Sequence, residues 1–502
     1  MVLVTAFLRP PRCRMNTGKC FLINWVHFII KMDQALLGID STVAFSNSQN
    51  VKGRGTLVHI TRKIVVFEVY NPYSLVQVSE ALSNIKVMRG DRLVYNGTGT
   101  VTYIVTTGLM SIVTVALSDV WADLNGLMPG AGLKIEAERF IKDWEVSHSL
   151  RSSYQLIVND IAGFLGELSR WLEEAESGVF LDEHGTVIES LKHEFYEEIK
   201  NAVAPKIFSI FADFENEASQ VPEEEADVHK AFVRRELHPL ILCSPFIHRA
   251  YTKPLGYAGD YEMVNMMLYE SKISSLSIYA NLIHDLYLQK APAKAHRNRI
   301  VILEDMLKEK AKDALQRNSI LKVLNVGCGP AVEVQRFVRT NSLCNHVDFE
   351  LLDFSKETID YAFSSIQTAS LVSGNKPSVK MIHKSIHALL RESTGKTNAD
   401  SVEYDFVYCA GLFDYLTQLV CKKLVELFNR WVRPGGSLLV SNVHSSNPDK
   451  FGMEHLVEWH LIYRDEVQIR DLVPNEPGIS FKIFMDPTGV NIFLLIEKEE
   501  NG

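Results

Sequence analysis

The chain has 502 residues, enough for two or three domains that each bury a hydrophobic core. Its composition, 46% hydrophobic and 23% charged, is ordinary for a globular protein, and its formal net charge of −9 gives no electrostatic reason to expect nucleic acid as a partner. The seven cysteines are dispersed without a C-x-x-C pair or metal-ligand spacing, so we expect reduced thiols, a cytoplasmic location and no metal site.

Residues 1–31 contain five basic residues, no acidic residue and an apolar run from Cys20 to Ile30. That run is too short for a membrane span, which takes about 20 residues, and no small-residue cleavage site follows it. We therefore expect no stable membrane span here. The pattern favours an extension ahead of a native start at Met32, outside any domain.

From residue 41 to about residue 123 the sequence is rich in Val, Ile, Thr and Tyr, which favour strands. Turn signals such as Asn-Pro and Asn-Gly punctuate the runs GTLVHITRKIVVFEVYN, RLVYNGTGTVTYIVTTG and LMSIVTVALSDVW. Several short strands at this spacing are typical of a small antiparallel barrel or sandwich. We place this β domain at residues 32–130.

Residues 131–290 change to a helical period. Apolar side chains recur at spacings of three and four in YQLIVNDIAGFLGELSRWLEE, namely Ile157, Ile161, Phe164, Leu168 and Trp171. This part of the chain is predicted to be a helical connector that ends in a lid.

Residues 291–502 alternate between strand and helix patterns. The predicted strands are LKVLNVG, VDFELLDFS, VKMIHKS, YDFVYCAG and GSLLVSNVH, followed by a terminal pair, ISFKIFMD and NIFLLIEKE. Alternating βα units predict an α/β fold with a mainly parallel, doubly wound sheet.

The first predicted strand ends in a glycine turn, LKVLNVGCGPAVEVQRFV. Gly327 and Gly329 permit a tight turn and a close backbone approach to a ligand, and the helix that follows offers free N–H groups. A dinucleotide fingerprint would need a third glycine where Val332 stands, and no Walker Gly-Lys-Ser/Thr follows. Taken alone, the glycine pair is equally compatible with an ordinary tight turn.

Three later motifs give the turn a context. Asp353 ends the second strand, 26 residues after Gly327, where a carboxylate can accept both hydroxyls of a ribose. The fourth strand runs into CAGLFDYL, and a Pro-Gly-Gly turn precedes the fifth in WVRPGGSLLVSNVH. In this order, over about 200 residues, the motifs resemble those of class I S-adenosylmethionine-dependent methyltransferases, which implies S-adenosylmethionine as the cofactor.

The resemblance implies roles for residues that follow four of the strands. Around the cofactor they are Gly327, Cys328 and Gly329 at the methionine part, Asp353 at the ribose, Phe354, Ser355, Ser385 and Ile386 at the adenine, and Cys409, Ala410 and Gly411 below the sulfonium. Facing the methyl acceptor they are Leu412, Phe413 and Tyr415. Many relatives carry an acidic residue after the third strand, and this chain does not.

Ahead of the sheet lies SPFIHRAYTKPLGYAGDYEMVNMM, residues 244–267, rich in glycine, tyrosine and charge. Such a segment is poor core material and could instead cover the cofactor as a lid that excludes water, with Tyr257 and Asp260 against the cofactor. Arg297, or Arg299, could pair with the methionine carboxylate, although each could equally be a surface cation of a helix.

The lid, YCAGLFDYL and the late NPDKFGMEHLVEWHLIYRDE together resemble a bacterial group of methyltransferases labelled extracellular-factor, hydroxypalmitic acid methyl ester biosynthesis proteins. In that group a PilZ-like β domain can precede the catalytic part. The cyclic-di-GMP motifs of PilZ domains are not matched, since Arg54 and Arg62 have the wrong spacing. We therefore expect a PilZ-like barrel without the nucleotide, serving dimerisation or partner docking; a homodimer through the barrel or the connector is left open.

Candidate acceptor residues follow the fifth strand. A carboxylate acceptor is already a nucleophile, whereas a hydroxyl or amine would need a base, for which His444 and His460 are the candidates. Arg464 could grip an acceptor carboxylate. The remaining predicted pocket residues of this segment are Glu454, Trp459 and Tyr463.

The sequence therefore predicts a methyltransferase for a small molecule, with a carboxylic or hydroxy fatty acid and its methyl ester as the first choice. N- or O-methylation of an amino acid or another small metabolite is the alternative within enzymes. A non-catalytic regulator that acts through the PilZ-like domain is the alternative outside them.

Overall fold

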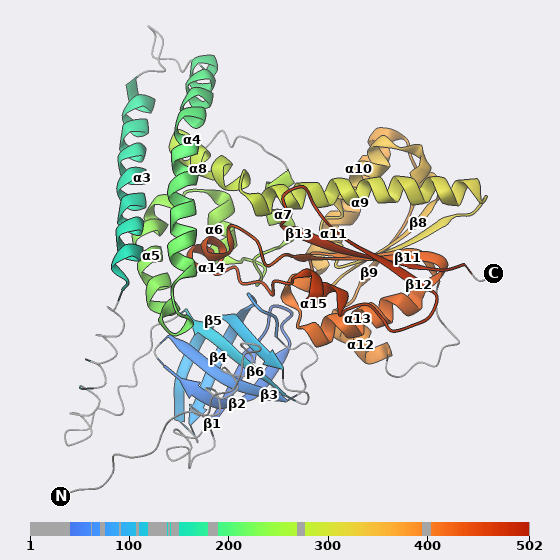
Figure 1. The fold of residues 1–502 in the computed structure, drawn as a ribbon, viewed down its shortest axis with the longest axis horizontal. Coiled ribbons are helices and arrows are strands. Elements are labelled where there is room, and N and C mark those ends of the chain that lie inside the picture. The colour runs from blue at the N-terminus through green and yellow to red at the C-terminus, as the bar shows by residue number, and fades with distance from the viewer. Residues whose placement is uncertain are drawn as a thin grey trace, which may run out of the picture.

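The fold is described from a computed structural model (Figure 1). The residues that it describes are 41–61, 63–70, 76–89, 92–106, 110–118, 138, 141, 150–178, 189–268, 277–393 and 403–500. The predicted extension at residues 1–31 lies outside them. Within this part of the chain, no helix is both long enough and apolar enough to cross a membrane.

The N-terminal part is a closed barrel in which every neighbouring pair of strands is antiparallel. The strands, in barrel order, are β1 (Ser41–Ser46), β2 (Lys52–Ile60), β3 (Ile64–Tyr70), β6 (Met110–Leu117), β5 (Arg92–Thr106) and β4 (Ala81–Arg89). Alternate side chains fill the interior, with Val43, Phe67 and Val115 fully buried. Closure removes the edges, and the predicted β-barrel is confirmed.

A helical region follows the barrel. Its members are α3 (Ser152–Gly178), α4 (Glu189–Ser219), η2 (Glu223–Glu225), α5 (Ala226–Ile241), α6 (Pro245–Thr252), α7 (Tyr261–Leu268) and α8 (Ile278–Leu288). Figure 1 shows α3 and α4 side by side as a long projecting pair. The buried stripe of α3 includes the predicted Ile161 and Leu168, and the predicted Ile157 and Phe164 are half-buried against the same core. The exception is Trp171, which is 49% exposed and lies beside the ring of Phe195 on α4.

The C-terminal part is a seven-stranded sheet. Its strands, in sheet order, are β12 (Ile479–Met485), β13 (Asn491–Lys498), β11 (Val432–Val443), β10 (Tyr404–Ala410), β7 (Leu321–Val326), β8 (Val347–Asp353) and β9 (Ser378–His383). The pairs from β11 to β9 are parallel, whereas β13 runs antiparallel to both of its neighbours. This order, with one reversed strand, is the mainly parallel, doubly wound α/β sheet that the sequence predicts.

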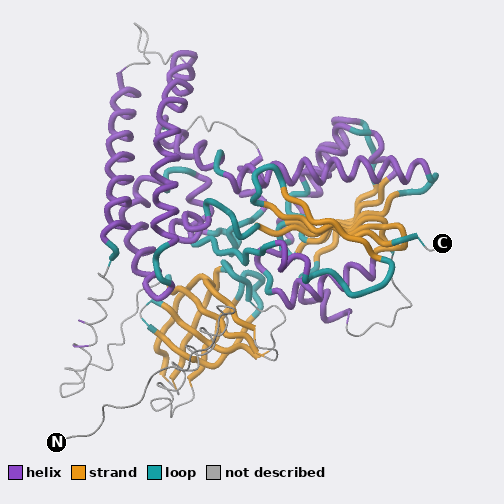
Figure 2. The backbone as a smooth tube through the Cα atoms, viewed as in Figure 1, coloured by secondary structure: helices purple, strands orange, loops and turns teal. Residues whose placement is uncertain are grey.

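Helices cover both faces of the sheet (Figure 2). One face packs against α9 (Ala291–Gln316), α10 (Val332–Thr340) and α11 (Lys356–Ser373). The other packs against α12 (Ile386–Ser393), α13 (Gln418–Trp431) and α15 (Glu466–Arg470). The short elements η3 (Ser342–His346), η5 (Phe413–Tyr415) and α14 (Lys450–Val457) complete the domain.

The strand order has a switch point between β7 and β10. From β7 the chain proceeds outward to β8 and β9, and from β10 it proceeds outward the other way to β11. In open α/β sheets, ligands bind beyond the carboxyl ends of the strands at such a point, because the connections there diverge and leave a crevice. We therefore expect a ligand site at the loops after β7, β8 and β10.

Candidate functional site

A cavity of about 230 Å³ lies beyond the carboxyl ends of β7, β8 and β10. The sheet domain supplies the turns after these strands, while α4, α6, α8 and α14 supply apolar side chains and the barrel supplies Gln77. Successive turns of α9 form one wall, from Lys290 at its start through Arg299 to Leu303. Since a helix rises about 1.5 Å per residue, Lys290 and Arg299 lie about 13 Å apart along this wall.

The glycine turn after β7 forms part of the cavity wall. Gly327 has φ +70° and Gly329 has φ +53°, and both line the cavity together with Cys328. The N–H groups of Gly327 and Cys328 donate to the carbonyl of Leu352 on β8 at 2.8 and 3.0 Å, so the turn is fixed against the neighbouring strand. Left-handed backbone of this kind favours glycine, and the turn takes the conformation that the sequence predicts.

Asp353 is 6% exposed at the end of β8 and faces the same cavity. Its oxygens accept the N–H groups of Gly329 at 3.1 Å and Ser355 at 2.9 Å. Burial raises the pKa of the Asp353 carboxyl above its usual value, against the lowering effect of these donors. Each oxygen keeps a lone pair for a further donor, so the carboxylate can accept two ligand hydroxyls.

Two aromatic rings stand beside Asp353. Phe354 follows it in the chain, and Tyr257 comes from the lid segment; their ring centroids are 5.3 Å apart, and both line the cavity. An aromatic pair next to a buried carboxylate with spare lone pairs has the chemistry to hold a flat base attached to a sugar.

Arg299, and not Arg297, faces the cavity. Arg299 is 8% exposed, and its guanidinium lies against Gly411, where an added Cβ would stand 3.1 Å from two of its nitrogens. Arg297 instead donates to the carbonyls of Met267 at 2.9 Å and Leu288 at 2.9 Å, which ties α7, α8 and α9 together. The prediction for Arg297 is therefore corrected: the phase of α9 turns it away from the cavity and turns Arg299 toward it.

His296 lies one helical turn before Arg299 on the same wall. Its Nδ1 is 2.7 Å from a guanidinium nitrogen of Arg299, which makes Nδ1 the acceptor. Burial, with the charges of Arg299 and Arg297, holds the pKa of His296 well below its usual value. His296 is therefore a neutral and weakly basic histidine.

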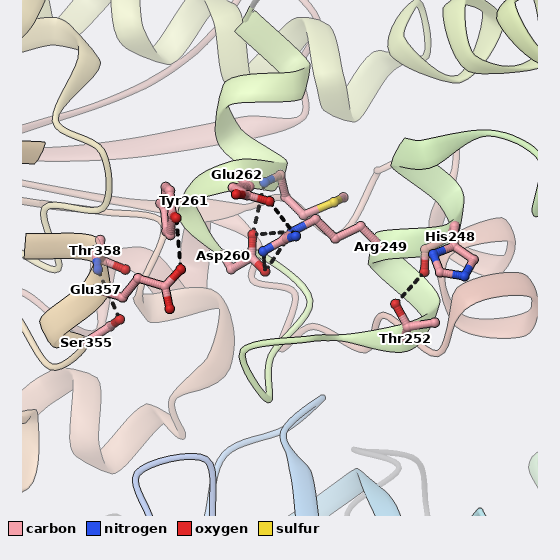
Figure 3. A network of polar contacts seen from close by, with 10 residues as sticks. His248, Arg249, Thr252, Asp260, Tyr261, Glu262, Ser355, Glu357 and Thr358 are labelled. Carbon is pink, nitrogen blue, oxygen red and sulfur yellow. Dashed lines mark hydrogen bonds and ion pairs between the residues drawn. The ribbon is translucent and has the colours of Figure 1, made fainter. Parts of the chain in front are cut away.

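The lid segment is held by an internal ion pair (Figure 3). Arg249 on α6 contacts both oxygens of Asp260, which also accepts the N–H of Met263 at the start of α7. Asp260 is fully buried in these contacts and does not line the cavity, so its predicted cofactor contact is corrected to a role in shaping the lid. Tyr261, its neighbour, lines the cavity and donates to Glu357 on α11 at 2.9 Å.

Tyr415 and Trp459 meet across the cavity. The indole Nε1 of Trp459 donates to the Tyr415 hydroxyl at 3.0 Å, so the Tyr415 proton remains free to point elsewhere. Burial raises the pKa of Tyr415 above its usual value, which keeps the phenol protonated. An added Cβ at Gly259 of the lid would lie 2.7 Å from this hydroxyl, so the glycine permits the lid to approach it.

The far end of the cavity, near Lys290, combines apolar walls with a few polar groups. Lys290 pairs with Asp449 at 2.5 Å, and its ammonium lies over the ring of Phe211 at 5.2 Å. The hydroxyl of Tyr287 is buried and has no hydrogen-bond partner among the described residues. The apolar cavity side chains that share a hydrophobic core with Phe211 and Tyr287 are Phe246, Ile247, Ala250, Leu456 and Val457.

Glu215 on α4 anchors α14 at this end. Its carboxylate accepts the N–H groups of Phe451 at 2.8 Å and Gly452 at 2.7 Å, where the helix would otherwise have free donors. Burial raises the pKa of Glu215 to about 7, against the lowering effect of these donors and of Lys290.

Several sequence-predicted residues lie elsewhere. Those that do not line the cavity are Arg297, Asp260, Ser355, Ser385, Ile386, Cys409, Phe413, His444, Glu454, His460, Tyr463 and Arg464. Strand alternation explains Cys409, because Tyr408 and Ala410 line the cavity while Cys409 packs into the core on the opposite face. Phe413 joins the same core.

Ser355, Ser385 and Ile386 serve the starts of helices. The Ser355 hydroxyl accepts the Thr358 N–H at 3.2 Å, which caps α11, and the Ser385 hydroxyl accepts the Ala388 N–H at 3.3 Å at the start of α12. Ile386 is buried in the core on that face. Their predicted adenine contacts stay predictions.

The two predicted bases are not directed at the cavity. His444 contacts the Ser446 hydroxyl at 2.6 Å and Glu466 at 3.3 Å. His460 is buried next to the barrel, where its backbone N–H donates to the Ser79 hydroxyl at 3.1 Å. Burial, with Lys230 and Arg234 nearby, holds the pKa of His460 well below its usual value.

Tyr463 and Glu454 lie near lysines. The ammonium of Lys450 is 5.1 Å from the Tyr463 ring centroid. Burial raises the pKa of Glu454, against the lowering effect of Lys450 and Lys230. Neither side chain is directed at the cavity.

Arg464 is 1% exposed and already bonded to the protein. It donates to the carbonyls of Phe413 at 2.8 Å and Leu416 at 2.6 Å. It also donates to the side chains of Gln418 at 2.7 Å and Asn442 at 2.5 Å. The predicted grip on an acceptor carboxylate is therefore corrected: Arg464 holds the loop after β10 against β11.

The sequence did not single out three further cavity residues, Asn325, Glu333 and Tyr408. Glu333 on α10 accepts from Asn325 on β7 at 3.0 Å and from Tyr408 on β10 at 2.8 Å. The one visible signal is Asn325, a polar residue within the apolar run VLNV of β7. Among the described residues, no group of three or more His, Cys, Asp or Glu side chains could hold a metal ion.

Comparisons with known proteins give only distant matches. No protein-family model matches the chain. A curated uncharacterized protein from Rickettsia prowazekii (strain Madrid E) is 24% identical over 120 residues, 24% of this chain and 42% of that protein, so the chain spans less than half the length of that relative.

Two solved structures that match the chain are likewise remote. A possible exported protein from Bordetella parapertussis aligns with a TM-score of 0.38 and 16% identity over 51% of this chain and 85% of that one. A magnesium protoporphyrin IX methyltransferase from Synechocystis PCC 6803 aligns with a TM-score of 0.33 and 11% identity over 54% and 99%. Function is therefore inferred from the chain's own residues.

Replacing Arg464 by Met should destabilise the fold and leave the affinity for the predicted methyl acceptor largely intact. The change removes the donors of two buried carbonyls and two side chains, so we expect a loss of about 3 kcal/mol in the free energy of unfolding, measured in urea. The exposed Arg470→Met on α15 is the matched control. Unchanged stability with impaired acceptor binding would restore the role predicted from the sequence.

Replacing Glu215 by Gln should change how stability depends on pH. A carboxyl whose pKa is about 7 in the folded chain and near 4.5 when unfolded stabilises the fold below pH 4.5. That contribution is lost as the pH rises through 7. Between about pH 5 and 7, wild type should lose on the order of 2 kcal/mol of unfolding free energy relative to Glu215→Gln. If the unfolding free energies of wild type and Glu215→Gln changed in parallel over this pH range, the prediction would be contradicted.

Proposed function

We propose that this chain is an S-adenosylmethionine-dependent methyltransferase acting on a small molecule. One observation carries the proposal: the glycine turn and the buried carboxylate of Asp353 line the same cavity at the switch point of the sheet. Through its spare lone pairs, a buried carboxylate of this kind can accept hydrogen bonds from the hydroxyls of a ligand.

The residues present fit the parts of this cofactor. Asp353 would accept the ribose hydroxyls, with the Phe354 and Tyr257 rings beside the adenine. Arg299, which has one nitrogen bonded to His296, keeps donors for the methionine carboxylate, and Gly411 makes room for the guanidinium. When bound, S-adenosylmethionine would supply a methyl group on a cationic sulfur.

The acceptor is inferred from the rest of the cavity. Among the described residues that line the cavity, one is a histidine, His296. It is a poor base, because its pKa is lowered and its Nδ1 accepts a hydrogen bond from Arg299. An acceptor that is already ionised, a carboxylate, needs no base. The neutral Tyr415 hydroxyl, oriented by Trp459, would donate its proton in a hydrogen bond to such an acceptor.

A carboxylic acid with a long apolar chain suits the far end. The apolar side chains of α6 and α14 would pack along the chain, and their burial excludes water from the reacting atoms. The unpartnered Tyr287 hydroxyl and the Lys290–Asp449 pair offer hydrogen bonds to a hydroxyl on that chain. We therefore favour a hydroxy fatty acid, converted to its methyl ester, over N- or O-methylation of an amine or a hydroxyl.

The test is methyl transfer from labelled S-adenosylmethionine to fatty acids, hydroxy fatty acids, amino acids and amines. We expect label on a hydroxy fatty acid that mild base releases as methanol. Asp353→Ala should weaken S-adenosylhomocysteine binding at least about 100-fold, because two hydrogen bonds to a carboxylate are lost. Base-stable label on an amine would contradict the acceptor, and failure of wild type to bind S-adenosylhomocysteine would contradict the whole proposal.

Tyr415→Phe should lower kcat/KM for the acceptor by about 10- to 100-fold, the cost of one hydrogen bond to a charged group. The dissociation constant of S-adenosylhomocysteine should not change. Tyr404→Phe, a change at the far end of β10 where the hydroxyl donates to Glu350, is the matched control. Equal effects of the two changes on kcat/KM would contradict the role of Tyr415.

A further inference from the structure

One loop of the barrel reaches the cavity. Residues 76–80 precede β4, and with Ala81, the first residue of that strand, they are called the barrel loop here. Gln77 in this loop lines the cavity, although it lies in a different domain and far from the other lining residues in sequence. Its side-chain amide makes no hydrogen bond within the described part of the chain.

The barrel loop is bonded to the segment that follows α14. Ser79 is fully buried with φ +66°, a strained conformation for a residue other than glycine. Its hydroxyl donates to the carbonyl of Glu458 at 2.9 Å and accepts the N–H of His460 at 3.1 Å. These two bonds flank Trp459, whose indole lines the cavity and orients Tyr415.

The same loop is bonded to the lid. The N–H of Ala81 donates to the carbonyl of Gly256 at 2.7 Å, next to the cavity residue Tyr257. Gly256 has φ +84°, and an added Cβ would stand 2.6 Å from the Cβ of Ser48 on the barrel. A side chain at position 256 would therefore push the lid and the barrel apart.

Glu80 holds the barrel loop in shape. Its carboxylate, 4% exposed, accepts the N–H and hydroxyl of Ser48 at 2.9 and 2.5 Å and the N–H of Gln77 at 2.7 Å. The loop that presents Gln77 is therefore rigid on the barrel side. Burying a carboxylate costs free energy unless hydrogen bonds satisfy its oxygens, as they do for Glu80. The sequence therefore specifies this conformation of the barrel loop.

We propose that the barrel is part of the methyl-acceptor site: Gln77 contacts the acceptor, and Ser79 and Ala81 position Trp459 and Tyr257 by holding the adjacent backbone. This proposal goes beyond the proposed function. Its prediction for the acceptor KM rests on that function, whereas its prediction for the backbone of the lid and of the segment after α14 does not. The amide of Gln77 offers both a donor and an acceptor, so it suits a neutral hydrogen-bonding group of the acceptor. Ser79 and Ala81 are positioning residues.

The test compares three variants of the full chain. Gln77→Ala removes the amide, and Ser79→Ala removes the hydroxyl that bridges Glu458 and His460. Thr102→Val is the matched control, because it removes a barrel hydroxyl that donates to the carbonyl of Thr114 within the barrel. Hydrogen exchange is measured for residues 251–261 and 456–461, with S-adenosylhomocysteine affinity and acceptor KM measured for a long-chain hydroxy fatty acid.

We expect Ser79→Ala to speed exchange in both segments and Thr102→Val to leave both unchanged. Gln77→Ala should raise the acceptor KM about fivefold, the value of one neutral hydrogen bond, with S-adenosylhomocysteine affinity unchanged. Exchange that changes only within the barrel, or an acceptor KM unaltered by Gln77→Ala, would overturn the proposal. Absence of S-adenosylhomocysteine binding in wild type would instead contradict the proposed function, while the exchange result still decides the positioning role.

Discussion

The buried carboxylate of Asp353 is the constraint on which the site depends. A carboxylate that is 6% exposed must be satisfied by hydrogen bonds, and the N–H groups of Gly329 and Ser355 supply two of them. These bonds in turn require the glycine turn after β7 to lie against β8, as the Leu352 carbonyl contacts also show. The geometry of the turn, and of the ligand that it can accept, follows from satisfying this one group.

A sheet edge alone would leave that carboxylate facing water. The cavity exists because three separate regions cover the edge: α9 with Arg299, the lid with Tyr257, and the segment after α14 with Trp459. The barrel loop secures two of these regions through hydrogen bonds to the Gly256 and Glu458 carbonyls. The N-terminal barrel and the C-terminal sheet are thus joined where the proposed chemistry takes place.

Features that depend on local sequence patterns, such as strands, turns and strand ends, could be predicted from the sequence. Strand patterns and turns gave the barrel and the doubly wound sheet, and Gly327 and Asp353 follow from their places at strand ends. The sequence could not predict the choice between Arg297 and Arg299, because both lie on one helix and only the packing of α9 sets its phase. It could not predict Gln77 at all, because domain docking brings that residue to the cavity. Arg464 and His460 were misassigned because polar residues near a site can serve the fold instead.

In the proposed arrangement, cofactor and acceptor share one cavity to which the barrel contributes Gln77. The most direct measurement is a crystal structure of the full chain with S-adenosylhomocysteine and a long-chain hydroxy fatty acid. We expect the ribose on Asp353, the amino-acid carboxylate on Arg299, and the fatty acid between Tyr415 and Tyr287 with Gln77 in contact. A ribose bound away from Asp353, or a fatty acid bound outside this cavity, would contradict this arrangement.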